Sequence, residues 1–378
     1  MYLKRMIALF FAAVMLTACA DVPEEVKSSA ERESSSASIA ENSATPAEST
    51  AENPADKITS AEYDNIKFAD TFTVNCGDPD GLGVYEAERR TDLTAHADEI
   101  FSAFFGSNYD SAKVTTAETD TALGKEADIS FEHGGTELHI NGRYLYFVNR
   151  NEDGKNLYFT NSDKLEALYE VAESTQNERI TLAEGEASVG ELAGKLEGFL
   201  EKLKSAGLGE FHPFTVASLT NKDQGRTLPT TEVIYRKYFK GLPIFNFAFV
   251  PQNSESPELN YLLIESDAVS FASRGSIFSG GFSSAYTEVR KVEAADSIIS
   301  PEQAVETASR SLAEYLDLTA LRLDLVYVPV VPEGAADNSK VTFYPYWLLA
   351  FGLQPLAENY ALINAVSGEV IYYDPKGV

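Results

Sequence analysis

The feature that most constrains the fold is a helix-opening pattern that occurs twice in the second half of the chain. Ser188-Val-Gly-Glu191 and Ser300-Pro-Glu-Gln303 each place an acid or amide three residues after a serine, the pattern of a capping box at a helix N-terminus. Apolar residues then recur at helical spacing, and β-rich segments follow. We therefore expect an α+β fold in which helices pack on antiparallel sheets, one or two helices to each sheet.

The segments after the two helices follow one plan. Strand-like stretches come first, at Phe214–Leu219 and Leu321–Val331, and longer strand pairs follow, at Glu232–Phe249 and Val341–Leu353. Both copies then end on similar runs, Asn260-Tyr-Leu-Leu-Ile-Glu265 and Asn359-Tyr-Ala-Leu-Ile-Asn364. We interpret residues 181–290 and 291–378 as duplicated units. Chance similarity of two αβ units is the alternative.

Residues 58–180 are expected to form a separate α+β domain, which is either a third copy of this plan or unrelated to it. The sequence predicts strands at Thr71–Cys76 and Gly83–Glu88, and a helix at Thr94–Phe105. It also predicts a hairpin in which Asp153-Gly154 joins Arg143–Val148 to Asn156–Thr160, and a helix capped by Ser162.

Residues 1–19 have the form of a bacterial export signal. Lys4 and Arg5 precede an apolar run that is too short to cross a hydrocarbon core, since a spanning helix needs about 20 residues. The run ends in Leu16-Thr17-Ala18-Cys19, which resembles the bacterial lipobox. This resemblance implies that the Cys19 thiol carries a diacylglyceryl group and that the signal is cleaved before it. A lipid on Cys19 would anchor the protein to the outer face of the cell membrane. An ordinary cleaved signal is the alternative.

An acidic spacer is expected between this anchor and the folded part. Ala20–Lys57 has no aromatic residue and contains nine acidic residues against three basic ones. Such a segment cannot bury enough apolar surface to offset its ordering entropy, so 20–57 is predicted to be a disordered linker. The whole chain has a formal net charge of −28, from 58 acidic and 30 basic residues, which argues against nucleic acid as a partner.

Three motifs from Ser188 onward resemble those of known extracytoplasmic domains. The C-terminal segment Asn359–Ile371, with Asn364 where the family usually has Asp, is similar to the last hairpin of PepSY-type domains. Val233–Phe245 and Phe343-Tyr-Pro-Tyr-Trp347 look like elements of YycH/YycI-like proteins. The resemblance implies a pair of PepSY-like units and a Gram-positive bacterial source, where the YycH/YycI group assists cell-wall sensor kinases. A lipid and a spacer would replace that group's transmembrane helix.

The sequence contains none of the usual catalytic motifs. It has no Gly-x-Ser-x-Gly elbow, His-Glu-x-x-His helix, phosphate loop or Gly-x-Gly-x-x-Gly. The four histidines have no metal-ligand spacing, and Asp78-Pro-Asp-Gly81 is interpreted as an acidic turn instead of a calcium loop. No catalytic residue, metal or cofactor is therefore predicted. Catalytic carboxylate pairs stay open, because among 58 acidic residues almost any spacing occurs by chance.

Aromatic and cationic side chains on strands are the candidates for partner binding. Alternation in Val233–Phe239 puts Arg236 and Tyr238 on one strand face, and Tyr346 adjoins Trp347, the one tryptophan. A peptide that adds to a sheet could contact these residues. The alternative is that they fill the core beneath the helices. A lipid on Cys19 leaves Cys76 as the one remaining thiol, so no internal disulfide is expected. Cys76 itself is predicted to be a small buried apolar residue.

Together these features predict a lipid-anchored, non-catalytic module that recognises an envelope protein or peptide. Two alternatives stay open. One is an envelope hydrolase that acts through carboxylates, and the other is a lipoprotein that binds a glycan or small ligand through its aromatic residues.

Overall fold

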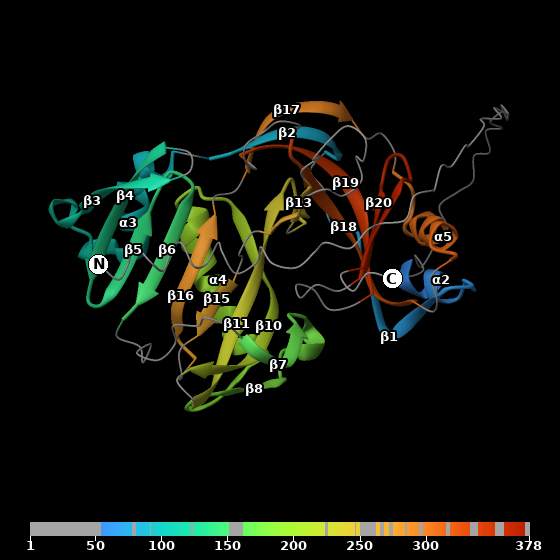
Figure 1. Cartoon of the computed structure of the whole chain (residues 1–378), viewed down its shortest axis with the longest axis horizontal. Helices are drawn as coiled ribbons and strands as arrows, with labels where there is room; N and C mark the ends of the chain where they lie inside the picture. The colour runs from blue at the N-terminus through green and yellow to red at the C-terminus, as the bar shows by residue number, and fades with distance from the viewer. Residues whose placement is uncertain are drawn as a thin grey trace, which may run out of the picture. The chain divides into compact units, whose positions relative to one another are not determined.

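Strands predominate in the described part of the chain, and most of them belong to two large sheets (Figure 1). The structure is a computed structural model and describes residues 54–77, 81–90, 92–121, 124–150, 162–223, 226–245, 247–249, 262–264, 268–271, 275–283, 286–294, 298–314, 318–332, 339–351 and 359–374. Residues Glu52–Val378 form one compact unit. The mixture of helices with mainly antiparallel strands confirms the α+β expectation at this coarse level.

Sheet A has nine strands among the described residues. Along its main path the order is β14-β13-β18-β19-β2-β17, with β1 also paired to β18, β20 to β19, and β21 to β20. The strands are β1 (Ile66–Asn75), β2 (Gly83–Arg89), β13 (Phe247–Phe249), β14 (Leu262–Ile264), β17 (Tyr286–Ala294), β18 (Leu318–Val330), β19 (Lys340–Ala350), β20 (Tyr360–Asn364) and β21 (Val370–Tyr373). β1 and β13 run parallel to β18, and the other pairs are antiparallel.

Sheet B has ten strands among the described residues, all paired antiparallel in the order β3-β4-β5-β6-β16-β15-β11-β10-β7, with β12 beside β11. They are β3 (Thr115–Thr121), β4 (Gly124–His133), β5 (Thr136–Ile140), β6 (Tyr144–Asn149), β7 (Ser162–Glu170), β10 (Glu210–Asp223), β11 (Arg226–Phe239), β12 (Leu242–Pro243), β15 (Ala268–Phe271) and β16 (Ile277–Ser283). A small ribbon joins β8 (Arg179–Leu182) to β9 (Gly185–Ser188).

The four α-helices of the described residues are α2 (Pro54–Thr59), α3 (Ala97–Phe105), α4 (Val189–Ser205) and α5 (Pro301–Ser311). Both predicted capping boxes are present. The Glu191 amide donates to Ser188 Oγ at 3.1 Å, and the Ser188 amide donates back to Glu191 Oε2 at 2.7 Å. At α5 the corresponding bonds join Ser300 and Gln303, at 3.2 and 2.8 Å. Each box satisfies amides that the first helical turn leaves without a partner.

Each capped helix is followed by four neighbouring antiparallel strands. After α4 these are β10, β11, β15 and β16, and after α5 they are β18, β19, β20 and β21. The two segments differ in the hairpin β13–β14, which lies in sheet A although it falls between β11 and β15 in the chain. Leu262–Ile264, the described part of the run Asn260–Glu265, is thus placed differently from Asn359–Asn364, because β14 pairs with β13 and not with β11.

The Gly-Leu-Pro-Ile-Phe corner carries the chain from sheet B to sheet A. After β12, the Ile244 amide donates to the Lys237 carbonyl of sheet B, and the next amide, of Phe245, donates to the Tyr327 carbonyl of sheet A, both at 2.8 Å. Phe239, at the end of β11, stacks on Phe343 of β19 with ring centroids 4.7 Å apart. The sheets are thus joined by backbone hydrogen bonds and by a shared aromatic contact.

Each sheet has a helix-covered face and a helix-free face. The buried cluster on the helix-covered face of sheet A includes Val305 of α5 and Trp347, and the equivalent cluster of sheet B includes Leu196 and Phe199 of α4. The clusters on the other two faces contain no helix residue among the described part, and Val326 and Ile234 are examples of their members. The apolar side that the sequence pattern gives to α4 and to α5 is therefore the side that packs against the sheet.

Four local predictions differ from the structure. Ser162 begins strand β7 instead of a helix, and the spacer predicted to run to Lys57 ends earlier, because α2 begins at Pro54 and buries Ile58 completely. Cys76 is exposed just past the end of β1, so it is not a buried apolar residue. Strand β6, predicted as the first half of a hairpin, pairs instead with β5 on one edge and β16 on the other.

Other predictions lie outside the described residues. These are the signal 1–19 with Cys19, the spacer up to residue 53, Asn156–Thr160 and the acidic residues at 78 and 80. Within the described part, no helix combines the length and apolarity needed to span a bilayer. Residues 58–180 contribute strands to both sheets. A sheet can contain strands from neighbouring domains, so sheet membership does not test the predicted domain boundaries at 180/181 and 290/291. These boundaries stay a prediction.

Candidate binding site

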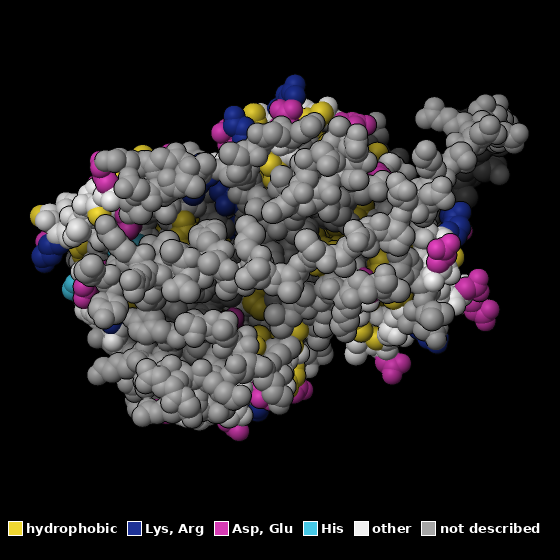
Figure 2. All heavy atoms as spheres, in the orientation of Figure 1, with side chains coloured by type: hydrophobic (Ala, Val, Ile, Leu, Met, Phe, Trp, Pro, Cys, Tyr) yellow, Lys and Arg dark blue, Asp and Glu magenta, His cyan; other side chains and the backbone are white. Residues whose placement is uncertain are grey.

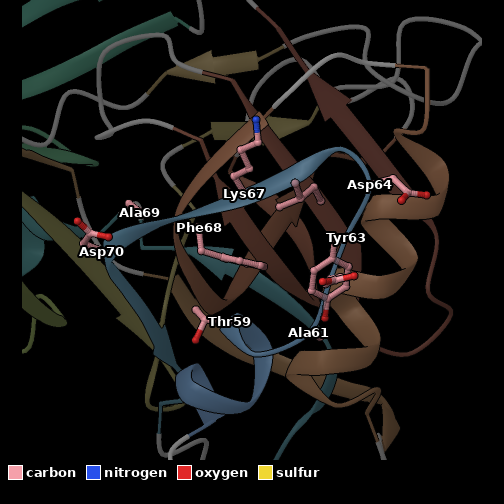
Figure 3. A pocket seen from close by; sticks show the side chains of 10 residues that line it. Thr59, Ala61, Tyr63, Asp64, Lys67, Phe68, Ala69 and Asp70 are labelled. Atoms are coloured by element: carbon pink, nitrogen blue, oxygen red, sulfur yellow. The ribbon is translucent and has the colours of Figure 1, made fainter.

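An open hollow of about 620 Å³ lies along the first half of β1 and the turn that precedes it (Figure 3). Two aromatic rings line it, Tyr63 from the turn and Phe68 from β1, with centroids 5.6 Å apart in an edge-to-face contact. Both side chains are partly exposed. Phe68 also packs against the buried ring of Phe72 at 4.7 Å, which anchors the hollow to the helix-covered core of sheet A.

A large bulge in β1 shapes this hollow. Ile66–Phe68 and Thr73–Asn75 pair with β18, but residues 69–72 have no partner there. These four residues span an interval that Leu321 spans by itself on β18, so β1 arches away from its neighbour. β1 pairs with no other described strand. Its outer edge and its arch therefore present backbone groups that no described strand pairs.

The hollow is acidic. Glu62, Asp64 and Asp70 line it, are exposed, and form no ion pair with any described residue. Lys67 also belongs to the lining, but its ammonium extends away from the two rings (Figure 3). Burial raises the pKa of Tyr63, and the negative charges of Glu306 and Glu302 on the neighbouring α5 raise it further. A cation would meet favourable charge at this site.

Arg236 lies far inside the protein and not on a docking surface. Its guanidinium is 3.3 Å from Asp324 Oδ2 of β18, and it stacks on the Phe214 ring of β10 at 3.4 Å. Arg322 lies over the same ring at 4.5 Å and reaches Asp324 at 3.2 Å. We call Asn75, Glu170, Phe214, Arg236, Arg322 and Asp324 the arginine cluster. It joins the helix-free faces of the two sheets.

The arginine cluster is short of acceptors. Asp324 also accepts a hydrogen bond from Asn75 at 2.8 Å, and Glu170 lies 3.5 Å from Arg322. Arg322 is 1% exposed, and its Nε forms an ion pair with Asp324 without hydrogen-bond geometry, while one terminal nitrogen has no hydrogen-bond partner in the structure. Burial and the charge of Arg322 lower the pKa of Arg236 to about 10, so Arg236 is still charged at neutral pH. The cluster therefore depends strongly on Asp324.

The remaining predicted residues are mostly buried as well. Trp347 is 1% exposed, and its indole nitrogen donates to the Ile299 carbonyl at 3.0 Å. Tyr346 points to the opposite, helix-free face of sheet A. Tyr238 is partly exposed and makes an edge contact with His212 at 4.8 Å. A partner could reach Trp347 or Arg236 only by opening a core, and binding by these four residues stays a prediction.

The sequence analysis missed the residues of the hollow. It placed the strand at Thr71–Cys76, although β1 begins five residues earlier. The spacing of Tyr63, Phe68 and Phe72 among acidic residues was the available signal. It is a weak one, because the bulge breaks the alternation by which a strand is recognised.

Titratable groups elsewhere do not form a recognisable reaction centre in the described part. No three His, Cys, Asp or Glu side chains there gather as they would around a metal ion. Burial raises the pKa of Glu232 on β11, with no neighbouring charge as a further cause.

Comparisons with known proteins leave the family open. No protein-family model matches the chain, and no curated protein matches its sequence. A solved structure of an uncharacterized protein from Eubacterium rectale is similar, with a TM-score of 0.48 and 12% sequence identity, over 81% of this chain and 90% of that one. Its description names no activity or ligand.

Proposed function

We propose that this protein is a lipoprotein held on the outer face of the cell membrane, and that its folded part binds an envelope protein or peptide without catalysing a reaction. The observation that carries the binding role is the open, acidic hollow beside the unpaired edge of β1. The spacer enters the folded part through α2, a few residues before this hollow. A membrane-proximal partner would therefore meet the hollow within reach of the anchor.

The finer part of the proposal is that the folded part contains two related PepSY-like units. The common order of a capped helix and four antiparallel neighbours supports a duplication. The turn after β20 supports the PepSY-like ending, because the amides of Val366 and Ser367 both donate to Asn364 Oδ1 and Gly368 has a positive φ of 76°. Asn and Gly suit such a turn for these reasons.

The anchor is tested with the variant Cys19→Ser in the bacterium. We expect the wild type to incorporate labelled palmitate and to sediment with membranes, and the variant to do neither. Cys76→Ser is the matched control, because it removes the other thiol and should behave as wild type. A Cys19→Ser protein that is still processed and membrane-bound like the wild type would refute the lipid anchor.

The binding role is tested by crosslinking on intact cells with a photoreactive amino acid in place of Thr71, an exposed residue of β1. We expect one or a few envelope proteins attached at this position and not at the exposed control position Glu186. Recovery of polysaccharide without protein would favour the glycan-binding alternative over our proposal. Turnover of envelope polymers by the purified protein would favour the hydrolase.

A further inference from the structure

We infer that the hollow along β1 is a docking site for an extended, lysine- or arginine-rich peptide segment, which pairs with the free edge of β1 and places a cationic side chain against Tyr63 and Phe68. This inference rests on the proposed binding role and adds the site and the chemistry of the partner. Three independent features of the hollow carry it.

The first feature is charge. Glu62, Asp64 and Asp70 have no ion pair within the described part of the chain, and the lysine of the lining extends away from the rings. Some acids elsewhere on the described surface do have a cationic partner. On edge strand β17, for example, Arg290 pairs with Glu86, and Glu288 pairs with Lys240 at 2.6 Å. Figure 2 shows basic, acidic and hydrophobic side chains mixed over β17 and β2. The uncompensated acids of the hollow therefore suit a cationic occupant.

The second feature is the aromatic pair. Tyr63 and Phe68 expose ring surface into the hollow, and they are held in place by the contact between Phe68 and Phe72. An ammonium or guanidinium over a ring face gains about 0.5–1 kcal/mol at an exposed site. The carboxylates of the lining add charge attraction, so a lysine or arginine side chain suits both parts of the lining.

The third feature is the backbone. The arch at residues 69–72 and the outer edge of β1 offer amides and carbonyls that no described strand pairs. An extended peptide can add to such an edge through main-chain hydrogen bonds. β1 is one of several edge strands, which include β17, β3 and β7, and what distinguishes it is that the hollow with its two rings lies along it.

The test uses the purified protein and three fluorescein-labelled decapeptides in an anisotropy titration at low salt. One alternates Lys and Thr, one alternates Glu and Thr, and one is the Lys peptide with alternate backbone nitrogens methylated. We expect the Lys peptide to bind, the Glu peptide to bind at least tenfold more weakly, and methylation to weaken binding at least fivefold because it removes main-chain donors.

Two charge variants locate the site. Asp70→Lys should weaken the Lys peptide at least tenfold, whereas Glu186→Lys, which changes the net charge equally at an exposed site on β9, should change it less than twofold. Glu62→Lys serves as a second variant if Asp70→Lys does not fold. Equal losses for the hollow and control variants, or no binding of the Lys peptide, would overturn the inference.

The peptide titrations test the docking site, and the crosslinking on cells tests the proposed function, so the two can fail independently. If the peptide titrations fail but crosslinking on cells still captures an envelope protein, the docking site is wrong and the binding role stands. If the peptides bind as expected but no envelope protein is captured, the hollow is a site for cationic peptides and the proposed function is wrong.

Discussion

The helix-covered and helix-free faces of the two sheets are stabilised in different ways. The helix-covered faces bury apolar side chains from α4 and α5 against apolar strand residues, as in the cluster around Leu196 and the cluster around Trp347. The helix-free faces meet through two buried arginines that share one aspartate. Apolar burial tolerates small changes in geometry, whereas buried charge is sensitive to the loss of one partner. The joint between the sheets is therefore the more vulnerable region.

The largest expected effect is on this joint. Asp324→Ala should lower the free energy of unfolding by about 3–5 kcal/mol, because it leaves two buried guanidinium groups without their shared carboxylate. Urea unfolding followed by Trp347 fluorescence measures this. Asp70→Ala, an exposed and unpaired acid, is the control and should change stability by less than about 0.5 kcal/mol.

A triple replacement tests whether unpaired buried charge is the cause of this loss of stability. Arg236→Met, Arg322→Met and Asp324→Leu together remove all three charges and should recover most of the stability lost in Asp324→Ala, because no unpaired charge is left behind. A loss of under 1 kcal/mol for Asp324→Ala would contradict the role given to the arginine cluster.

A smaller effect is expected on the helix-covered faces. Ser188→Ala and Ser300→Ala should each cost about 1 kcal/mol, since each removes one acceptor at a helix start. Similar losses of stability in the two variants would show that the two capping boxes stabilise their helices to the same extent. Ser205→Ala, at the exposed end of α4, is the control and should cost clearly less. A loss of stability in Ser205→Ala as large as in Ser188→Ala or Ser300→Ala would contradict the role of the capping serines.

The smallest effect concerns pH on the helix-free face of sheet B. The nearby carboxylates of Asp128 and Glu137 raise the pKa of His139, against the opposing effect of burial. The closer contact is to Glu137, with Nε2 2.8 Å from Oε1, whereas Nδ1 lies 3.8 Å from Asp128, beyond hydrogen-bond length. Arg150 pairs with the same glutamate, and Tyr146 lies 6.4 Å away.

The direction of the pKa shift of His139 determines how its contribution to stability changes with pH. A raised pKa in the folded state stabilises the protein below the unfolded value of about 6.5, and this contribution is lost as pH rises through the folded pKa. We therefore expect the stability difference between wild type and His139→Gln to be larger at pH 5.5 than at pH 8.5 in urea unfolding. His133→Gln, at the exposed end of β4, is the control. A difference that is the same at both pH values would contradict this role of His139.

Local patterns predicted what local chemistry decides. The two capping serines, the amphipathic helices and the Asn364 turn all appear, because each depends on residues within a few positions. The failure at Ser162 has a non-local cause. Ser162 has the look of a cap and Leu165, Leu168 and Tyr169 have helical spacing, yet this segment pairs with β10 over most of its length. Non-local pairing outweighed local propensity there.

The sequence by itself determined the α+β class, the starts of α4 and α5, and the strong negative charge, because these depend on composition and short-range spacing. Only the tertiary structure decided which strands share a sheet, that Arg236 is buried against Asp324, and that β1 arches to form a hollow. Contacts of this kind join residues far apart in the chain, such as Arg236 and Asp324, 88 positions apart. No short-range pattern encodes such a distance, so the fold itself must bring the partners together.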